Sequence, residues 1–88
     1  MYVIIVYDVE QKRVGKMCKL LREYLNWIQN SVFEGEITLG KLTELKSRIK
    51  KIMDEDVDSV IFFRMESNKW LKRDVMGKEF NPTDNIVI

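Results

Sequence analysis

The side chains that could do chemistry in this sequence are carboxylates, lysines, tyrosines and hydroxyls, because its 88 residues include no histidine. Without histidine, Ser–His and Cys–His nucleophile pairs, histidine general bases and His-containing zinc sites are excluded. Any hydrolytic chemistry must therefore use the remaining polar side chains or a bound metal ion.

Asp8 is the first candidate, because it ends a hydrophobic segment directly after Tyr7. One carboxylate holds Mg²⁺ poorly, but two symmetry-related copies of Asp8 near a two-fold axis could hold one hydrated ion. Such an ion could activate water and neutralise charge on a phosphodiester. The alternative interpretation is structural, with Asp8 capping a helix or pairing with Lys12 or Arg13.

Basic residues form the second candidate site. Between Lys12 and Arg22 there are five basic residues and no acidic one, although the net charge of the whole chain is only +1. Uneven charge of this kind can make a positive face that contacts phosphates without regard to base sequence. The alternative is an ordinary solvated helix face.

The acidic segment that ends in Asp58 imitates a calcium-binding loop but does not match one. Asp54, Asp56 and Asp58 have the required spacing, yet Ser59 stands where the loop needs glycine and Met65 where it needs glutamate. We therefore exclude an EF-hand.

Hydrophobic periodicity predicts the elements that must position these residues. An apolar stripe with a period of 3.6 residues indicates two helices, the second with Thr38 as its N-cap and Leu39 in its stripe. The segment at 27–37 is expected to fold as a tight hairpin or a bent strand, with its corner at Asn30-Ser31 and a bulge at Gly35. The expected strands are 2–9, 59–65 and 85–88, and the expected helices are 11–25 and 39–53.

The order of these elements predicts an α+β fold of the ferredoxin-like βαββαβ type with an extra C-terminal strand. We expect one domain over residues 1–88, with a core at 1–66 and a tail at 67–88. Both alternating sets of strand residues are apolar, so the sheet face that the helices leave open needs a cover. A second copy packed sheet to sheet in a homodimer would supply it, with strand 86–88 expected at a sheet edge, that of the partner in preference to its own.

The chain is also expected to be cytoplasmic. Its single cysteine, Cys18, allows no intrachain disulfide, and no secretion signal is recognisable. The longest apolar run, at 2–7, is too short to cross a bilayer, so no membrane partner is expected.

Taken together, the motifs resemble a known family, the small CRISPR-associated protein that dimerises and bridges two copies of the CRISPR integrase. Most of the chain takes part in the resemblance, and the Ser-Val-Phe-Glu block at this distance from the strand-terminal Tyr-Asp is its most specific part. The matching pieces are Tyr7-Asp8-Val9, Lys12-Arg13 with Lys16, Tyr24, the segment 29–35 and Asp58-Ser59-Val60.

The resemblance implies roles for individual residues. Asp8 matches the metal-associated aspartate at the dimer interface, with Tyr7 as its neighbour, and the implied metal is Mg²⁺ shared by the Asp8 residues of both subunits. Ser31 and Phe33 match the strand motif that flanks the cleft, and complete the implied catalytic set. The residues implied to bind nucleic acid are Lys12, Arg13, Lys16 and Lys19.

The resemblance also implies partners and activity. The implied partners are a second copy in a homodimer, the integrase subunit, and double-stranded DNA, with single-stranded RNA as the alternative. The implied role is the acquisition of new spacers, and some members show metal-dependent endonuclease activity. Trp27 departs from the family pattern, which usually has arginine there, so nuclease activity is less expected than the scaffold role. A stand-alone, toxin-like endoribonuclease of the same fold is the alternative.

Overall fold

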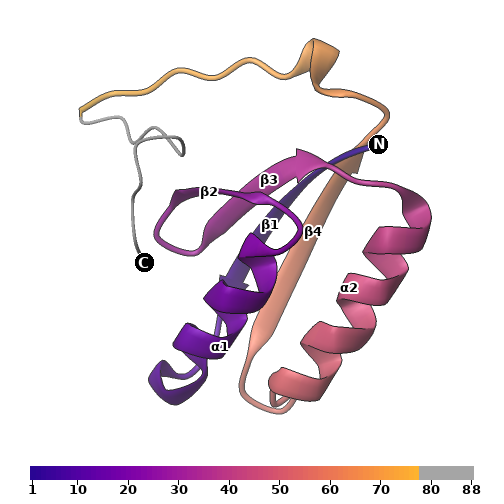
Figure 1. Ribbon diagram of the computed structural model, residues 1–88. Helices are drawn as coiled ribbons and strands as arrows, with labels where there is room; N and C mark the ends of the chain where they lie inside the picture. Colours follow the sequence, from indigo (N-terminus) through magenta and orange to yellow (C-terminus); the bar gives the residue numbers. More distant parts are fainter. Residues whose placement is uncertain (78–88) are drawn as a thin grey trace.

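The computed structural model describes residues 1–77, which form a four-stranded antiparallel sheet with two helices on one face (Figure 1). The strand order is β2-β3-β1-β4, so the first strand lies in the interior of the sheet. This arrangement confirms the predicted α+β, ferredoxin-like βαββαβ fold. Its elements are β1 (Tyr2–Asp8), α1 (Gln11–Arg22), β2 (Asn26–Gln29), β3 (Val32–Glu36), α2 (Leu39–Ile52), β4 (Ser59–Met65) and a short 3₁₀ helix, η1 (Asn68–Trp70).

Two local signals in the sequence fix the connections as predicted. The Thr38 side chain accepts a hydrogen bond from the Lys41 N–H at 3.1 Å and so caps the first turn of α2. The β2–β3 hairpin turns at Asn30 and Ser31, where Asn30 adopts a positive φ of 41°. Asparagine tolerates this left-handed conformation better than most residues.

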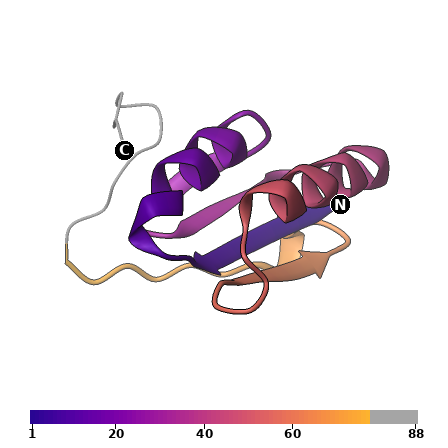
Figure 2. The same cartoon turned by 90° about the horizontal axis from the view of Figure 1, so that it is seen from below.

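Alternation along β1 separates two faces of the sheet. Val3 and Ile5 point toward the helices and are fully buried, whereas Ile4 and Val6 point to the other side and are only partly buried. We call these the covered face and the open face; Figure 2 shows both helices on one side of the sheet. The helices contribute buried side chains to the covered face, among them Met17, Leu20, Leu21, Leu42, Leu45 and Ile49.

Part of the open face lies under the chain's own segment after β4, which passes along that side of the sheet (Figure 2). There the Tyr2 hydroxyl donates to Glu34 at 2.8 Å, and the Arg73 guanidinium pairs with the same carboxylate. The rest of the open face carries Ile61 and Phe63, which remain 49% and 51% exposed. The structure thus leaves an apolar surface of the kind that the sequence predicted.

Three expectations about the elements need correction. Helix α1 ends at Arg22, three residues earlier than predicted. Leu39 is 63% exposed, because it lies six residues before Leu45 and is turned about 120° from it at about 100° per residue. The β-bulge lies in β2, between Trp27 and Gln29. Gly35 instead allows close packing, since a Cβ there would lie 3.2 Å from the Leu25 side chain.

The predicted terminal strand at 85–88, and its pairing with a sheet edge, lie outside the described residues. Neither α1 nor α2, the two α-helices within residues 1–77, has the length and apolar character needed to cross a membrane.

Candidate metal and nucleic-acid site

Asp8 is the last residue of β1 and its side chain belongs to the set that points to the open face. It is exposed, and within residues 1–77 its carboxylate has no hydrogen-bond or ion-pair partner. Helix α1 begins with Glu10 at its N-cap and with no side-chain cap, and Arg13 pairs elsewhere. The structural interpretation of Asp8, as a cap or an ion-pair partner, is therefore not observed.

Tyr7 and Phe33 point to the covered face, away from Asp8. Their rings stack with centroids 6.3 Å apart and an interplanar angle of 28°, and both side chains are buried. Burial, with a smaller contribution from Cys18, raises the pKa of Tyr7 to about 12. Neither ring is placed to touch a ligand of Asp8, so any effect they have on it must pass through the backbone of β1 and β3.

Ser31 lies at the β2–β3 turn and at the same end of the sheet as Asp8. Its carbonyl accepts a hydrogen bond from the Tyr7 N–H at 3.1 Å. The Trp27 indole N–H donates to the Asn30 carbonyl at 3.1 Å and closes the same turn. Trp27 therefore supports the turn that carries Ser31.

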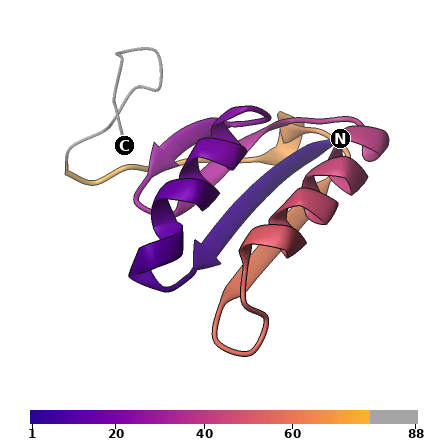
Figure 3. The same ribbon diagram turned by 60° about the horizontal axis from the view of Figure 1, so that its bottom comes forward.

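Lys12, Lys16 and Lys19 form one exposed stripe along α1, which we call the lysine stripe. Their spacing of four and three residues places them on one side of the helix. Figure 3 shows that the end of β1 lies beside the first turn of α1, so the stripe begins at the same end of the molecule as Asp8. The stripe nevertheless belongs to the helix layer, whereas Asp8 points to the opposite, open face.

Arg13, which the resemblance implies to bind nucleic acid, has partners within its own chain. Its Nε donates to Asp58 Oδ2 at 2.5 Å and its Nη2 to Glu10 Oε1 at 2.7 Å. The bonds from Arg13 hold the pKa of the Asp58 carboxyl well below its usual range. The structure thus gives Arg13 an internal partner, whereas the three lysines of the lysine stripe are exposed on α1.

Sequence reasoning did not predict that two carboxylates, those of Asp58 and Glu34, are buried. In the sequence Asp58 ends the acidic segment that contains Asp54 and Asp56, and its position directly before a hydrophobic strand was the available signal. In the sequence Glu34 belongs to the Ser-Val-Phe-Glu motif. Its position in the middle of the β3 segment, between Phe33 and Gly35, was the available signal.

The fit of a divalent cation depends on a second copy of the chain. Within the described residues no three metal-ligating side chains gather, so one subunit does not form a complete protein site. Asp8 nevertheless offers an exposed, unengaged carboxylate of the kind that Mg²⁺ binds together with water. Two such carboxylates brought together by symmetry fit a hydrated Mg²⁺, whereas one alone does not.

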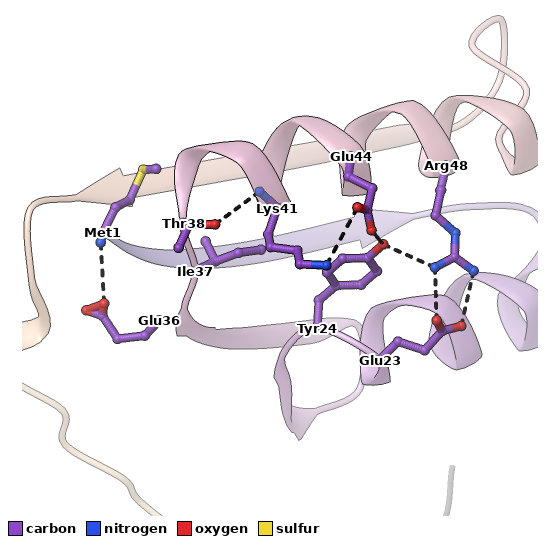
Figure 4. A pocket seen from close by; sticks show the side chains of 9 residues that line it. All are labelled: Met1, Glu23, Tyr24, Glu36, Ile37, Thr38, Lys41, Glu44 and Arg48. Carbon is purple, nitrogen blue, oxygen red and sulfur yellow. Dashed lines mark hydrogen bonds and ion pairs between the residues drawn. The ribbon is translucent and has the colours of Figure 1, made fainter.

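A pocket of about 560 Å³ lies at the other end of β1 from Asp8. Figure 4 shows that its polar groups bond to one another. The Arg48 guanidinium pairs with Glu23 at 2.9 Å, and the Tyr24 hydroxyl donates to Glu44 at 2.5 Å. The pocket therefore presents few unsatisfied groups to a ligand. Its lining also includes Met1, Glu36, Ile37, Thr38 and Lys41.

Comparison with known proteins decides the family. Residues 1–73 match the model of the family described as CRISPR associated protein Cas2. The chain belongs to the Cas2 family. A relative from Methanocaldococcus jannaschii, named CRISPR-associated endoribonuclease Cas2, is 52% identical over 99% of this chain and 76% of its own length. A relative of the same name from Thermococcus kodakarensis is 47% identical over 99% of this chain and all of its own.

Solved structures agree with this Cas2 assignment. A crystal structure titled cas2 has a TM-score of 0.85 and 46% identity, and the match covers 99% of this chain and 98% of the other. The Streptococcus pyogenes Cas2 crystal structure has a TM-score of 0.79 and 32% identity, covering 88% and 100%. The resemblance inferred from the Tyr-Asp and Ser-Val-Phe-Glu motifs is therefore confirmed.

Proposed function

We propose that this Cas2 protein acts as a homodimer that binds nucleic acid and hydrolyses phosphodiester bonds with a divalent metal, RNA being the first substrate expected. The observation that carries the proposal is Asp8, an exposed carboxylate without a partner in residues 1–77, beside an apolar surface that is also exposed. Relatives named CRISPR-associated endoribonuclease support the choice of RNA. Their names also favour a CRISPR-associated role over a stand-alone toxin.

Dimerisation through the open face would complete the site. Ile61 and Phe63 lie on that face, about half exposed, in the same sheet as Asp8. Contiguous apolar surface of this kind typically marks an interface. A two-fold axis that packs two open faces together uses the same patch on both copies, and an axis near the end of β1 brings two Asp8 carboxylates together.

Each residue of the predicted site then has a distinct task. The two Asp8 carboxylates would hold one hydrated Mg²⁺, which supplies an activated water and neutralises charge on the phosphodiester. Tyr7 and Phe33 would act as positioning residues, because their stacked rings anchor the covered side of the strand that ends in Asp8. Ser31 lies at the same sheet end and its side chain interacts with that of Tyr7, so it would help Tyr7 to hold the end of β1.

The experiment is cleavage of labelled RNA and duplex DNA by wild-type protein and the Asp8→Ala variant, with Mg²⁺ and with EDTA. We expect Mg²⁺-dependent cleavage by wild type and a loss of at least about 100-fold in Asp8→Ala, since metal stabilisation is worth several kcal/mol and 1.36 kcal/mol is tenfold. Asp56→Asn, which removes an exposed charge in the loop before β4, is the matched control. Equal cleavage by wild type and Asp8→Ala would exclude this site.

A scaffold in spacer acquisition is the second proposed function, and the lysine stripe favours it. The stripe lies on the helix layer, so a dimer could hold duplex DNA there while docking the integrase at both ends, without using Asp8. Such binding depends on phosphate contacts and falls steeply with salt. The two functions use opposite faces of the molecule and are therefore separable by mutation.

The scaffold is tested with the triple variant of the lysine stripe, Lys12→Ala, Lys16→Ala and Lys19→Ala. We expect the slope of log affinity for duplex DNA against log salt to fall by about 0.9 for each phosphate that the variant no longer neutralises. The control is Lys50→Ala with Lys51→Ala, two exposed lysines of α2. Asp8→Ala should integrate spacers normally, and loss of integration in a dimeric, DNA-binding Asp8→Ala protein would contradict the scaffold.

A further inference from the structure

Asp58 is a buried carboxylate with a complete set of hydrogen-bond donors. It lies between α2 and β4, and its side chain is 0% exposed. Arg13 donates to it twice, from Nε at 2.5 Å and from Nη2 at 2.9 Å. The backbone N–H groups of Glu10 and Asp54 each donate at 2.9 Å. We call the group formed by Asp58, Arg13 and the Glu10 N–H the Asp58 clamp.

The Asp58 clamp holds the chain on two sides of Asp8. Along the chain, Glu10 follows Asp8 by two residues, and its N–H is fixed by Asp58 Oδ1. Across the sheet, Asp8 is paired in the β1–β4 ladder with Ser59, the residue directly after Asp58. The backbone that carries Asp8 is therefore restrained by the buried Asp58 carboxylate on two sides, along the chain at Glu10 and across the sheet at Ser59.

Symmetry makes this restraint matter more for a shared site than for a site within one chain. If each Asp8 shifts by a given distance, the separation of the two symmetry-related carboxylates changes by up to twice that distance. Mg²⁺ requires near-octahedral geometry at about 2.0–2.1 Å, and functional groups must be held within about 0.5 Å. A loosely held β1–α1 connection would exceed that tolerance readily.

We propose that the Asp58 clamp is a positioning device for Asp8, which sets the distance at which two Asp8 carboxylates meet around one hydrated divalent cation. The proposal rests on the paired metal site proposed above. Asp58 touches neither the metal nor the substrate, so Asp58 and Arg13 act only through the backbone at Glu10 and Ser59. This role also explains why Arg13, in a helix of exposed lysines, is turned inward.

The test compares Asp58→Asn with wild type, using Mn²⁺ as the probe and electron paramagnetic resonance to measure free Mn²⁺. Asparagine keeps the size of the side chain but removes its charge and an acceptor oxygen. We expect Mn²⁺ affinity to fall by about 10- to 100-fold, as when other groups that orient a metal ligand are removed. At saturating Mn²⁺ the cleavage rate should return toward that of wild type. Asp56→Asn, with the same charge change in the same loop, should bind as wild type.

Folding and dimerisation are checked by circular dichroism and sedimentation. If Asp58→Asn does not fold, Arg13→Lys decides, because it keeps the charge but loses the paired donors; we then expect about 3- to 10-fold weaker Mn²⁺ binding, within the range for such residues. If neither variant folds, amide hydrogen exchange in wild type decides: a protected Glu10 amide supports the Asp58 clamp, and rapid exchange overturns it.

The outcomes separate this inference from the proposed function. A folded, dimeric Asp58→Asn protein with wild-type Mn²⁺ affinity overturns the positioning role and leaves the paired site standing, provided that Asp8→Ala loses Mn²⁺ binding. If Asp8→Ala binds Mn²⁺ as wild type does, the paired site fails and the positioning role falls with it. Weakened binding in Asp58→Asn and abolished binding in Asp8→Ala together support both.

Discussion

The covered and open faces of the sheet are made from the same strands but differ in how far their side chains are exposed. On the covered face, Phe33 and Ile5 have no exposed surface. On the open face, Phe63 is 51% exposed and Asp8 has no partner within residues 1–77. Adjacent residues of one strand therefore have different environments, because successive side chains point to opposite faces of the sheet. We infer that the covered face stabilises the fold and that the open face is reserved for a partner or ligand.

We expect Phe33→Ala, on the covered face, to destabilise the protein strongly. Removing a fully buried aromatic ring typically costs about 3–5 kcal/mol, out of a total of roughly 5–15 kcal/mol for a small domain. We therefore expect much lower stability in urea denaturation, or a protein that does not fold. A loss below about 1 kcal/mol would contradict tight packing beneath α1 and α2.

The corresponding change on the open face, Phe63→Ala, should act on association instead of folding. Its ring is half exposed in the single subunit, so the stability of the monomer should change little. A symmetric interface contains each residue twice, and aromatic anchors often contribute about 2 kcal/mol or more. We expect the dissociation constant of the dimer to rise by at least about tenfold in sedimentation equilibrium.

Val57→Ala is the matched control for Phe63→Ala. Val57 is also an exposed apolar residue, at 60%, but it lies in the loop before β4. Its truncation should leave the dimer unchanged. If Val57→Ala weakens association as much as Phe63→Ala does, the interface does not use the open face.

A smaller effect is expected on the ionisation of two tyrosines, Tyr7 on the covered face and Tyr2 on the open face. Burial raises the pKa of each to about 12, and for Tyr2 the hydrogen bond to Glu34 adds to the shift. The folded state therefore favours the neutral phenol, so this stabilisation is present below the unfolded pKa of about 10 and is lost as pH rises toward 12. In a pH titration followed by phenolate absorbance, these two tyrosines should ionise well above pH 10. One of the two ionisations should be absent in Tyr7→Phe and the other in Tyr2→Phe. Ionisation of both near pH 10 without unfolding would contradict this burial.

Local chemistry made most of the fold predictable. Thr38 caps α2 and Asn30 turns the hairpin because each uses its own side chain or its own backbone conformation within a few residues. The Asp58 clamp was not predictable in the same way, since Arg13 and Asp58 are 45 residues apart and only the folded chain brings them together. Sequence patterns showed that Arg13 is basic but not which anion it would meet.

The sequence suggested candidate residues for the site but not their geometry. The alternation of β1 could have shown that Tyr7 and Asp8 face opposite sides of the sheet. The motif places them in one site only because they are adjacent in the sequence. Only the register of the sheet shows that Phe33 shares the face of Tyr7 and that Asp8 does not. Whether two Asp8 residues meet depends on a second copy, which neither the periodicity nor the motif describes.

The strand order has a consequence for how the protein is made. Strand β1 lies between β3 and β4, so the first of these four strands to be synthesised obtains its second neighbour only when residue 65 has been synthesised. At roughly 5–20 residues per second, its apolar side chains wait on the order of several seconds for that partner. During synthesis, the nascent chain therefore exposes an apolar strand whose unpaired edge is prone to aggregate until β4 is available.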